Sequence, residues 1–307
     1  MPKLFHGGVP ASTLGKAALA AVMVAALAAC GGGDSTPPTS TVSSSSVAAT
    51  RYGSPAIISI AGTNLDSSGL SVTSTGCKNM TRLTSGALVS TSTNAYYTCT
   101  VSGAFSSSVV IKSNGATIAS PTFIVPAPQV TLTVSNGQGV SGSIVLTLMG
   151  DKVPTTVDNF LSYVNKSPSF YKGTIFHRLA KLISDPTHYF VVQGGGYGAT
   201  VNGQLPAHKA TDAPINIETA GGNNVQWSVA MANVGPGTVT SEFFFNVVDN
   251  TSTLQNGYSV FGNITSGTDV VQQMLAAPVV CTSNALIGTI DCIPQPDITI
   301  TDAVQTR

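Results

Sequence analysis

Short runs of β-branched and aromatic residues, separated by turn residues, recur along this chain and limit what it can fold into. Runs of this length and composition are typical of β-strands. They read AIISIAG, LSVTS, ALVST, AYYTCTV, SVVIK and TFIV before residue 126, and QVTLTV, SIVLTLM, TIFHRL, YFVVQGG, WSVAMAN, SEFFFNVV, YSVFGNI and ITITDAV after it. Only two segments, 153–164 and 268–277, carry apolar residues at helical spacing. The sequence therefore predicts a fold dominated by β-structure, with two helices.

Residues 1–29 have the pattern of an export signal. Two lysines precede an apolar run at 17–26 that is too short to span a bilayer, and LAAC followed by GGG comes next. This pattern resembles a bacterial lipoprotein signal, which implies cleavage before Cys30 and lipidation of that cysteine. Gly31 then favours the outer membrane, with the chain facing the periplasm, by analogy with lipoprotein sorting. The alternative is an ordinary secretory peptide with a chance cysteine, and both interpretations predict an exported chain.

The cysteine count agrees with export. Five cysteines are present, and setting aside Cys30 leaves an even number, Cys77, Cys99, Cys281 and Cys292. An oxidising compartment would pair them. The pairing that demands the least long-range geometry joins Cys77 to Cys99 and Cys281 to Cys292. A zinc site is the alternative, but the closely spaced cysteine or histidine pairs that it needs are missing from the sequence.

Composition divides the exported part into a tether and two domains. Residues 30–50 have few apolar side chains and two adjacent prolines, which predicts a flexible tether. Residues 51–126 predict a small β-sandwich, loosely similar to bacterial immunoglobulin-like modules, with a hairpin turn at 113–115. This part carries no catalytic constellation, and a spacer or binding module is expected. Residues 127–307, about 180 in number, are enough for a second domain with a sizeable core.

Charge and motif spacing narrow the partners. The formal net charge is zero and only 8% of residues are charged, without a basic stripe that could neutralise phosphates, so nucleic acid is not expected as a partner. Membrane contact is expected only through lipid at Cys30. The four histidines are scattered without metal-ligand spacing, and GGGYG at 194–198 lacks the lysine of a phosphate-binding loop. We expect a monomer with no cofactor and no metal.

Five motifs of the second domain carry a family resemblance. They are GSIVLTLMGDKVPTTVDNFLSYV, FYKGTIFHR, FVVQGGG, AMANVGPGTVTSEFFFNV and GYSVFG, and they follow one another in the order and approximate spacing of a cyclophilin. The resemblance covers residues 129–303. It implies an eight-stranded antiparallel β-barrel with two helices and peptidyl-prolyl cis-trans isomerase activity on proline-containing polypeptides.

The same resemblance assigns candidate site residues. Arg178 resembles the catalytic arginine of the family. The residues that would bind substrate are Phe190, Val191, Gln193, Ala232, Asn233, Glu242, Phe244, Leu254 and Tyr258. Independently of the family, a guanidinium cannot act as a base because it stays protonated and offers only donors. Rotation about a peptide bond needs no proton transfer, so a permanent donor aimed at the twisted prolyl nitrogen suits this reaction.

The chain also departs from the family. Twelve positions separate Arg178 from Phe190, which predicts an inserted loop at 179–188 on the edge of the pocket. Glu242 stands where the family usually has glutamine and would bring a carboxylate within reach of Arg178. Leu254 replaces a common tryptophan, and Val191 is smaller than the usual methionine. We expect a lipid-anchored isomerase that assists the folding of exported proteins; the alternative is a catalytically weak cyclophilin-like binding or chaperone module.

Overall fold

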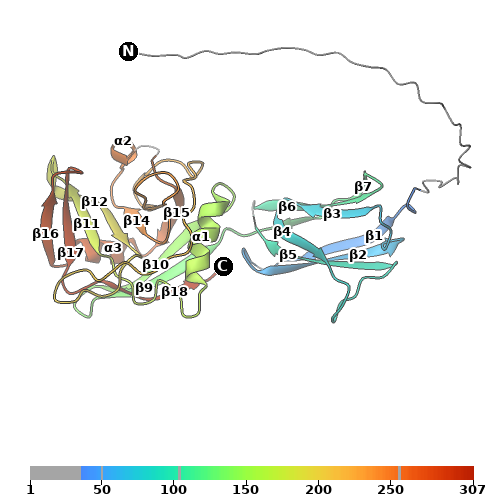
Figure 1. Cartoon of the computed structure of the whole chain (residues 1–307), viewed down its shortest axis with the longest axis horizontal. Helices are drawn as coiled ribbons and strands as arrows, with labels where there is room; N and C mark the ends of the chain where they lie inside the picture. The colour runs from blue at the N-terminus through green and yellow to red at the C-terminus, as the bar shows by residue number, and fades with distance from the viewer. Residues whose placement is uncertain (1–35, 50, 103–104, 255–256) are drawn as a thin grey trace, which may run out of the picture. The chain divides into compact units, whose positions relative to one another are not determined.

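The computed structural model describes residues 36–49, 51–102, 105–254 and 257–307 of the chain. The signal segment 1–29 and the lipidation site predicted at Cys30 lie outside the described residues. All the assigned strands and helices belong to the unit Pro37–Arg307 (Figure 1). Within these ranges, none of the helices has the length and hydrophobicity that a membrane span requires.

The N-terminal part of this unit contains two antiparallel sheets. One has the order β1-β2-β5-β4 and the other the order β3-β6-β7, with β8 paired to β6. The strands are β1 (Thr41–Ala48), β2 (Pro55–Thr63), β3 (Leu70–Ser74), β4 (Cys77–Arg82), β5 (Asn94–Val101), β6 (Ser106–Ser113), β7 (Ala116–Ala119) and β8 (Thr122–Ile124). Alternate residues of β2, β5 and β6 are buried, as expected for strands with one face on a core.

The hairpin turn predicted at 113–115 is confirmed. Asn114 and Gly115 both have positive φ, at 48° and 85°, which is the backbone of a tight hairpin turn between β6 and β7. The predicted strand ALVST at 87–91 is wrong. Leu88 and Val89 are exposed there in irregular structure, and the chain instead forms β4 shortly before it.

The predicted tether is also wrong for its second half. Residues 41–48 form strand β1, which pairs antiparallel with β2. Val42 and Val47 pack against the core, while the serines between them contribute only backbone hydrogen bonds. An edge strand can form through backbone hydrogen bonds to its neighbour without an apolar sequence. The polar composition of residues 41–48 therefore wrongly indicated a tether.

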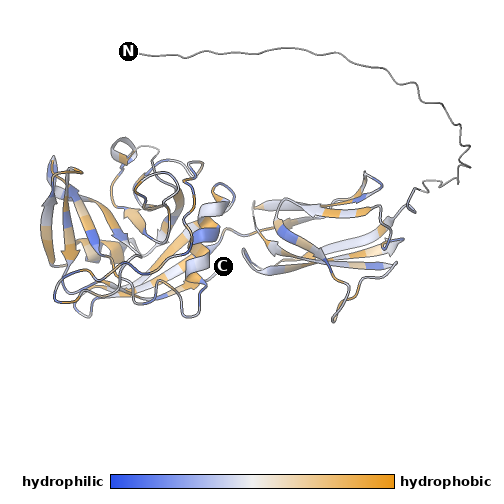
Figure 2. Cartoon of the chain, viewed as in Figure 1, coloured by the Kyte–Doolittle hydropathy of each residue, from blue (hydrophilic) through white to orange (hydrophobic). Residues whose placement is uncertain are grey.

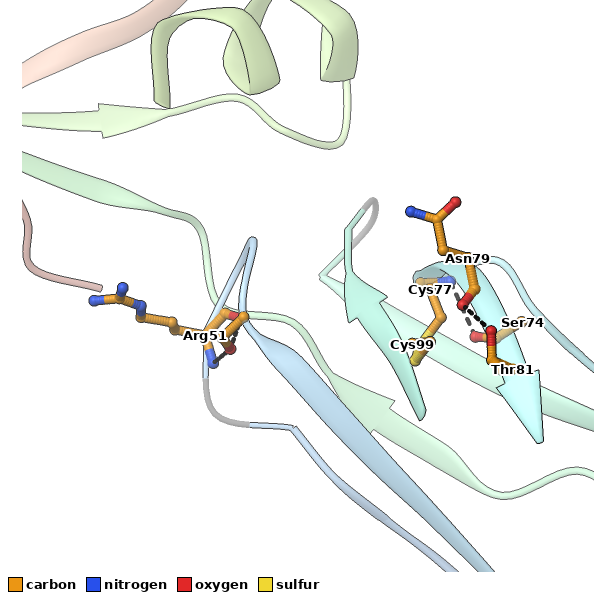
Figure 3. The surroundings of a disulfide bond; sticks show 8 residues. Arg51, Ser74, Cys77, Asn79, Thr81 and Cys99 are labelled. Atoms are coloured by element: carbon orange, nitrogen blue, oxygen red, sulfur yellow. Dashed lines mark hydrogen bonds between the residues drawn. A yellow bond between two sulfur atoms is a disulfide. The ribbon is translucent and has the colours of Figure 1, made fainter. Parts of the chain in front are cut away.

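A disulfide joins the neighbouring strands β4 and β5 (Figure 3). It links Cys77 to Cys99, and because Cys77 lies opposite Val101, the bond runs diagonally across the ladder. The pairing expected from the sequence is therefore formed in this part of the chain.

The C-terminal part is organised around one ten-stranded sheet. Its order is β16-β17-β11-β12-β14-β13-β15-β10-β9-β18, and all its pairs are antiparallel. The strands are β9 (Gln129–Ser135), β10 (Ser141–Leu148), β11 (Arg178–Leu182), β12 (Asp185–Gly194), β13 (Ser228–Met231), β14 (Phe243–Asn246), β15 (Val260–Ser266), β16 (Val279–Asn284), β17 (Thr289–Pro294) and β18 (Thr299–Gln305). The segment before β11 also bonds to β18, since the backbone N–H of Phe176 donates to Ile298 and that of Ile300 donates to Thr174.

Helix α1 (Pro154–Val164) packs an apolar stripe into the core of this sheet. Proline stands at its first turn, where its missing N–H costs nothing, and the Glu218 carboxylate accepts hydrogen bonds from the Thr156 backbone N–H and hydroxyl at 2.6 and 2.7 Å. Phe160 is fully buried and meets Phe243 edge to face, with ring centroids 5.5 Å apart. Figure 2 shows the apolar residues concentrated in the strands that form this core.

Two further helices complete the described part of the chain. Helix α3 (Thr268–Leu275) confirms the segment predicted at 268–277, and Val271 and Met274 on it are fully buried. Helix α2 (Thr251–Leu254) is a single turn that the sequence did not predict.

The insertion predicted as a loop at 179–188 is not a loop. It extends strands β11 and β12 into a long hairpin, in which Leu182 pairs with Asp185 across a two-residue turn. The outer edge of β11 pairs in turn with β17 of the hairpin β16–β17, which the sequence did not predict. The inserted residues are therefore part of the sheet. Strand β11 begins at Arg178, whereas the sequence predicted a strand that begins at Thr174.

Candidate active site

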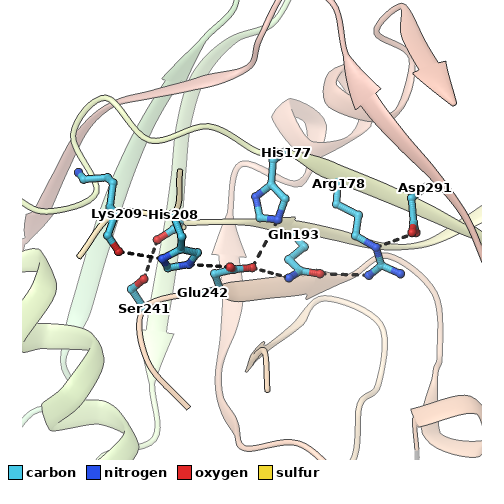
Figure 4. A network of polar contacts seen from close by, with 9 residues as sticks. His177, Arg178, Gln193, His208, Lys209, Ser241, Glu242 and Asp291 are labelled. Atoms are coloured by element: carbon cyan, nitrogen blue, oxygen red, sulfur yellow. Dashed lines mark hydrogen bonds and ion pairs between the residues drawn. The ribbon is translucent and has the colours of Figure 1, made fainter. Parts of the chain in front are cut away.

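Arg178 is fixed at the first residue of β11, directly opposite Gln193 of β12. Its Nη1 donates a hydrogen bond to Gln193 Oε1 at 3.0 Å (Figure 4). Backbone register thus sets the two side chains together, although they lie fifteen positions apart in the chain.

Asp291 holds the other side of the same guanidinium. Arg178 Nε donates to Asp291 Oδ1 at 2.7 Å, and Asp291 lies on β17 opposite Ala180. Asp291 is not among the site residues that the sequence predicts. Asp291 is 113 positions from Arg178, and no local pattern signals that β17 will pair with β11.

Glu242 does not pair with Arg178, contrary to the expectation that its carboxylate could reach the arginine. Its Oε2 accepts a hydrogen bond from Gln193 Nε2 at 2.6 Å, so that Gln193 lies between the two charges. Its Oε1 is 2.8 Å from His208 Nε2, and its Oε2 is 3.4 Å from His177 Nε2. One row of polar contacts therefore runs from His208 through Glu242 and Gln193 to Arg178 and Asp291 (Figure 4).

The row keeps the Glu242 carboxyl ionised. Burial by itself would raise the pKa of Glu242, but the hydrogen bonds from His177 and Gln193 and the charges of the neighbouring histidines outweigh burial, and the pKa lies below its ordinary value. The ring of Tyr197 packs between the two histidines, with centroids 4.7 Å from His177 and 5.0 Å from His208. Burial, and then the charge of Glu242, raises the pKa of Tyr197.

A small apolar cluster lies beside this row and is separate from the main core. Its buried members are Ala180, Phe190, Val191, Ala230, Phe244 and Val260, and Leu182, Ala232, Leu254 and Tyr258 pack against them. Phe244 is central because it pairs with both Gln193 and Ala230 across the ladder and meets Tyr258 edge to face at 5.2 Å. Strand pairing thus brings apolar walls next to the arginine and its glutamine.

Helix α2 carries Leu254 to the edge of this cluster. The buried Asn250 fixes the start of the helix, because its Nδ2 donates to the Phe190 carbonyl at 2.7 Å and its own carbonyl accepts from the Leu254 backbone N–H. Helix α2, which the sequence did not predict, therefore positions Leu254, one of the predicted substrate-binding residues.

Two cavities flank the pair formed by Arg178 and Gln193. One, of about 230 Å³, is lined by Gln193, Ala232, Asn233, Glu242, Val234, Thr238 and Thr240. The other, of about 300 Å³, is lined by His177, Arg178, Asp291, Gly203, Gln204, Leu205, Val280, Thr282, Ile293 and Gln295. Asn233 lines the first cavity, and its side-chain amide donates to the Gly257 carbonyl at 3.0 Å.

The structure brings all the predicted substrate-binding residues into this neighbourhood: Phe190, Val191, Ala232, Phe244, Leu254 and Tyr258 in the apolar cluster, and Gln193, Asn233 and Glu242 beside it. Within the residues that the structure describes, no group of three or more His, Cys, Asp or Glu side chains could hold a metal ion. What the arrangement offers is a fixed cationic donor beside an apolar surface.

Comparisons with known proteins concern the C-terminal part of the chain. Residues 130–304, more than half of the chain, match the family described as cyclophilin type peptidyl-prolyl cis-trans isomerase/CLD. A peptidyl-prolyl cis-trans isomerase of Acinetobacter baylyi is 38% identical over 143 residues, which cover 45% of this chain and 69% of that protein.

Two further bacterial relatives are similar over the same extent. The peptidyl-prolyl cis-trans isomerase cyp18 of Streptomyces antibioticus is 44% identical over 140 residues, 43% of this chain and 76% of its own. Peptidyl-prolyl cis-trans isomerase B of Escherichia coli is 38% identical over 142 residues, 43% of this chain and 78% of its own.

Proposed function

The chain belongs to the cyclophilin-type peptidyl-prolyl cis-trans isomerases, and we propose that Arg178 and the apolar cluster around Phe244 are the parts that carry the isomerase activity. The family gives the reaction, rotation about X-Pro bonds of polypeptides. The proposal concerns which side chains perform it. The observation that carries it is the guanidinium of Arg178, held by two partners beside a buried apolar cluster.

The reaction needs the resonance of the X-Pro amide to be broken, against a barrier of about 18–20 kcal/mol. In the twisted transition state the prolyl nitrogen regains a lone pair, which a hydrogen-bond donor can stabilise. The Nε and Nη1 of Arg178 are engaged by Asp291 and Gln193, and the described residues offer no hydrogen-bond partner for Nη2. We assign Nη2 as the group that donates to the prolyl nitrogen.

The arginine accounts for part of the rate only. A hydrogen bond from a charged group contributes about 1.5–3 kcal/mol, which corresponds to about ten- to a hundredfold in rate. The remainder is assigned to Phe190, Val191 and Phe244, which would hold the proline ring and keep water away from the twisting bond. Ala232 and Asn233, on the segment after β13, would bind the substrate backbone.

A catalytically weak binding module was the alternative, and two sequence features favoured it. One was an inserted loop that could obstruct the pocket, but these residues form the hairpin β11–β12. The other was Glu242, which could have paired with Arg178, but it bonds Gln193 and the histidines. Both features leave the arginine available, which supports the enzyme.

The assignment of Arg178 is tested by exchange NMR of an Ala-Pro peptide with the chain from Gly31 onward and with Arg178→Ala. We expect the wild type to accelerate cis-trans exchange and the variant to lose at least tenfold in kcat/KM, with an unchanged circular dichroism spectrum. A folded Arg178→Ala variant as active as the wild type would contradict the assignment.

The finer features of the fold are also proposals. Without the hairpin β16–β17, the ten-stranded sheet has eight strands, from β11 to β18. The hydrogen bonds between residues 173–176 and 298–300 join its two ends, which supports a closed eight-stranded barrel. The two sheets before residue 126 support an immunoglobulin-like sandwich, for which we propose a spacer role and expect no catalytic contribution.

Export and anchoring complete the proposal. The signal pattern of residues 1–29 supports lipidation at Cys30, an outer-membrane location facing the periplasm, and a role in folding exported proteins. The two disulfides agree with an oxidising compartment. Mass spectrometry of the N-terminal peptide from membrane fractions tests this, with Cys30→Ala as the control. A wild-type chain that stays in the membrane-free fraction, with an unmodified cysteine, would contradict the anchor.

A further inference from the structure

We infer that Asp291 is a positioning residue for catalysis, which orients the Arg178 guanidinium from a hairpin closed by the Cys281–Cys292 disulfide. The inference rests on the proposed role of Arg178, and it identifies the residue that sets the orientation of the arginine side chain. It concerns the hairpin β16–β17, a part of the chain to which the proposed mechanism assigns nothing.

The contact itself is short and partly shielded from water. The Nε of Arg178 lies 2.7 Å from Asp291 Oδ1, and the two side chains are 22% and 26% exposed. A charge-assisted hydrogen bond at this distance is about twice as strong as a neutral one. It is also directional, because Nε carries a single N–H, whereas each terminal nitrogen carries two.

Two anchors on different nitrogens fix the plane of the guanidinium. Asp291 holds Nε and Gln193 holds Nη1, and these partners come from β17 and β12, the two strands that flank β11. With one anchor the planar group could pivot about the remaining hydrogen bond. With two anchors Nη2 is held in one direction, which is the requirement for a donor that must meet a transient lone pair.

The hairpin is built to keep Asp291 in place. Asp291 lies opposite Ala180, and its neighbour Cys292 lies opposite Leu179 of β11. Cys292 is fully buried, faces Cys281 across the ladder, and is bonded to it. Cys292, the residue next to Asp291, is therefore joined to β16 by a disulfide and to β11 by strand pairing.

The charge of Asp291 has a second consequence. Arg178 lies beside an apolar cluster, where a guanidinium loses part of its hydration. A carboxylate on the side away from Gln193 compensates for that loss. An amide at the same position would preserve the hydrogen bond without the charge, so Asp291→Asn separates the two effects.

The experiment is a double-mutant cycle on the full exported chain. kcat and KM for an Ala-Pro peptide are measured for wild type, Asp291→Ala, Asp291→Asn, Arg178→Ala and the double Ala variant. Ser283→Ala, an exposed position in the same hairpin, is the matched control. The ¹⁵N and ¹H resonances of Arg178 Nε report on the hydrogen bond, and melting temperatures report on folding.

We expect Asp291→Ala to lose about tenfold in kcat with KM within about twofold, and Asp291→Asn to lose less, because its carbonyl still accepts from Nε. In the Arg178→Ala background, Asp291→Ala should change kcat by less than about twofold. The Nε–H resonance should exchange faster with water in Asp291→Ala, and Ser283→Ala should match the wild type.

Two results would overturn the inference while the proposed function stands. One is an Asp291→Ala variant as active as the wild type beside an inactive Arg178→Ala. The other is an equal loss from Asp291→Ala with and without the arginine, which would make its effect independent of Arg178. A fully active Arg178→Ala variant would instead overturn the proposed catalytic role, and with it this inference.

Discussion

Glu242 accepts a hydrogen bond from the side-chain amide of Gln193 at 2.6 Å. Because the other end of that amide accepts from Arg178, the carboxylate fixes the direction of the glutamine rather than neutralising the arginine. The sequence makes Glu242 look like a competitor for the Arg178 guanidinium, but in the structure it supports the neighbouring Gln193.

This role predicts that glutamine can replace Glu242. In Glu242→Gln the side-chain carbonyl still accepts from Gln193, so kcat/KM should stay within about threefold of the wild type. In Glu242→Ala the amide of Gln193 loses its anchor and can flip, and we expect a loss of about tenfold. The measurement is the exchange rate of an Ala-Pro peptide; equal activity of Glu242→Ala and the wild type would show that the anchor is dispensable.

The same contacts predict a pH dependence of stability. The pKa of Glu242 is lower in the folded chain than its ordinary value of 4.5, so the folded state binds fewer protons at this site than the unfolded state. The stability that Glu242 contributes is therefore complete above about pH 4.5 and is lost as the pH falls through the lower, folded pKa. Urea unfolding of wild type and Glu242→Gln at about pH 7 and about pH 3.5 tests this.

The free energy of unfolding of the wild type should fall relative to that of Glu242→Gln between these two conditions. His177 and His208 are present in both proteins, and Glu242→Gln removes only the titratable carboxyl that they contact, which makes it the matched control. A difference that stays constant or grows on acidification would rule out the lowered pKa.

The two disulfides should differ in their effect on activity. Removing either pair by alanine substitution should destabilise the chain by about 3 kcal/mol. The separations are 22 and 11 residues, and because the entropy of loop closure depends on the logarithm of loop length, the two effects should differ by less than about 1 kcal/mol. Only removal of Cys281–Cys292 should lower kcat, by about three- to tenfold, since this bond supports the strand that carries Asp291. Assays well below both melting temperatures separate the effects. Equal activity of the two double variants would contradict the special role of the hairpin.

Phe244 should contribute mainly to binding of the proline ring. Burial of a phenylalanine-sized surface is worth about 1.5–3 kcal/mol, so Phe244→Ala should lower kcat/KM by about ten- to a hundredfold, and Phe244→Leu by less. Phe105→Ala, at an exposed position of the N-terminal part, is the control and should have no effect. Peptide titration followed by NMR measures the change in affinity; full activity of Phe244→Ala would remove this residue from the site.

The sequence was informative where structure is set locally. The apolar stripe of α1 and the turn at Asn114 and Gly115 depend on neighbours within a few positions, and both were predicted. The motifs also named Arg178 and Gln193 as candidates, and strand pairing sets these two residues opposite each other. The short separations within each cysteine pair indicated both disulfides, and both are formed.

The sequence was uninformative where a strand is defined by its partner. The serine-rich strand β1 forms by pairing with β2, and the hairpin β16–β17 is held by the pairing of β17 with β11. The periodicity of their own sequences does not predict either pairing. The role of Asp291 could not be predicted for the same reason. Its contact with Arg178 depends on the pairing of β17 with β11, and a single aspartate in a strand does not indicate such a contact.

The orientation of the Arg178 guanidinium is tested by the exchange rate of an Ala-Pro peptide with the wild type and with Arg178→Lys. Lysine keeps the positive charge but cannot bond Asp291 and Gln193 while presenting a third donor in a fixed plane. We expect clear acceleration by the wild type and at least a tenfold loss in kcat for the folded Arg178→Lys. An Arg178→Lys variant as active as the wild type would show that charge alone suffices and would contradict the oriented guanidinium.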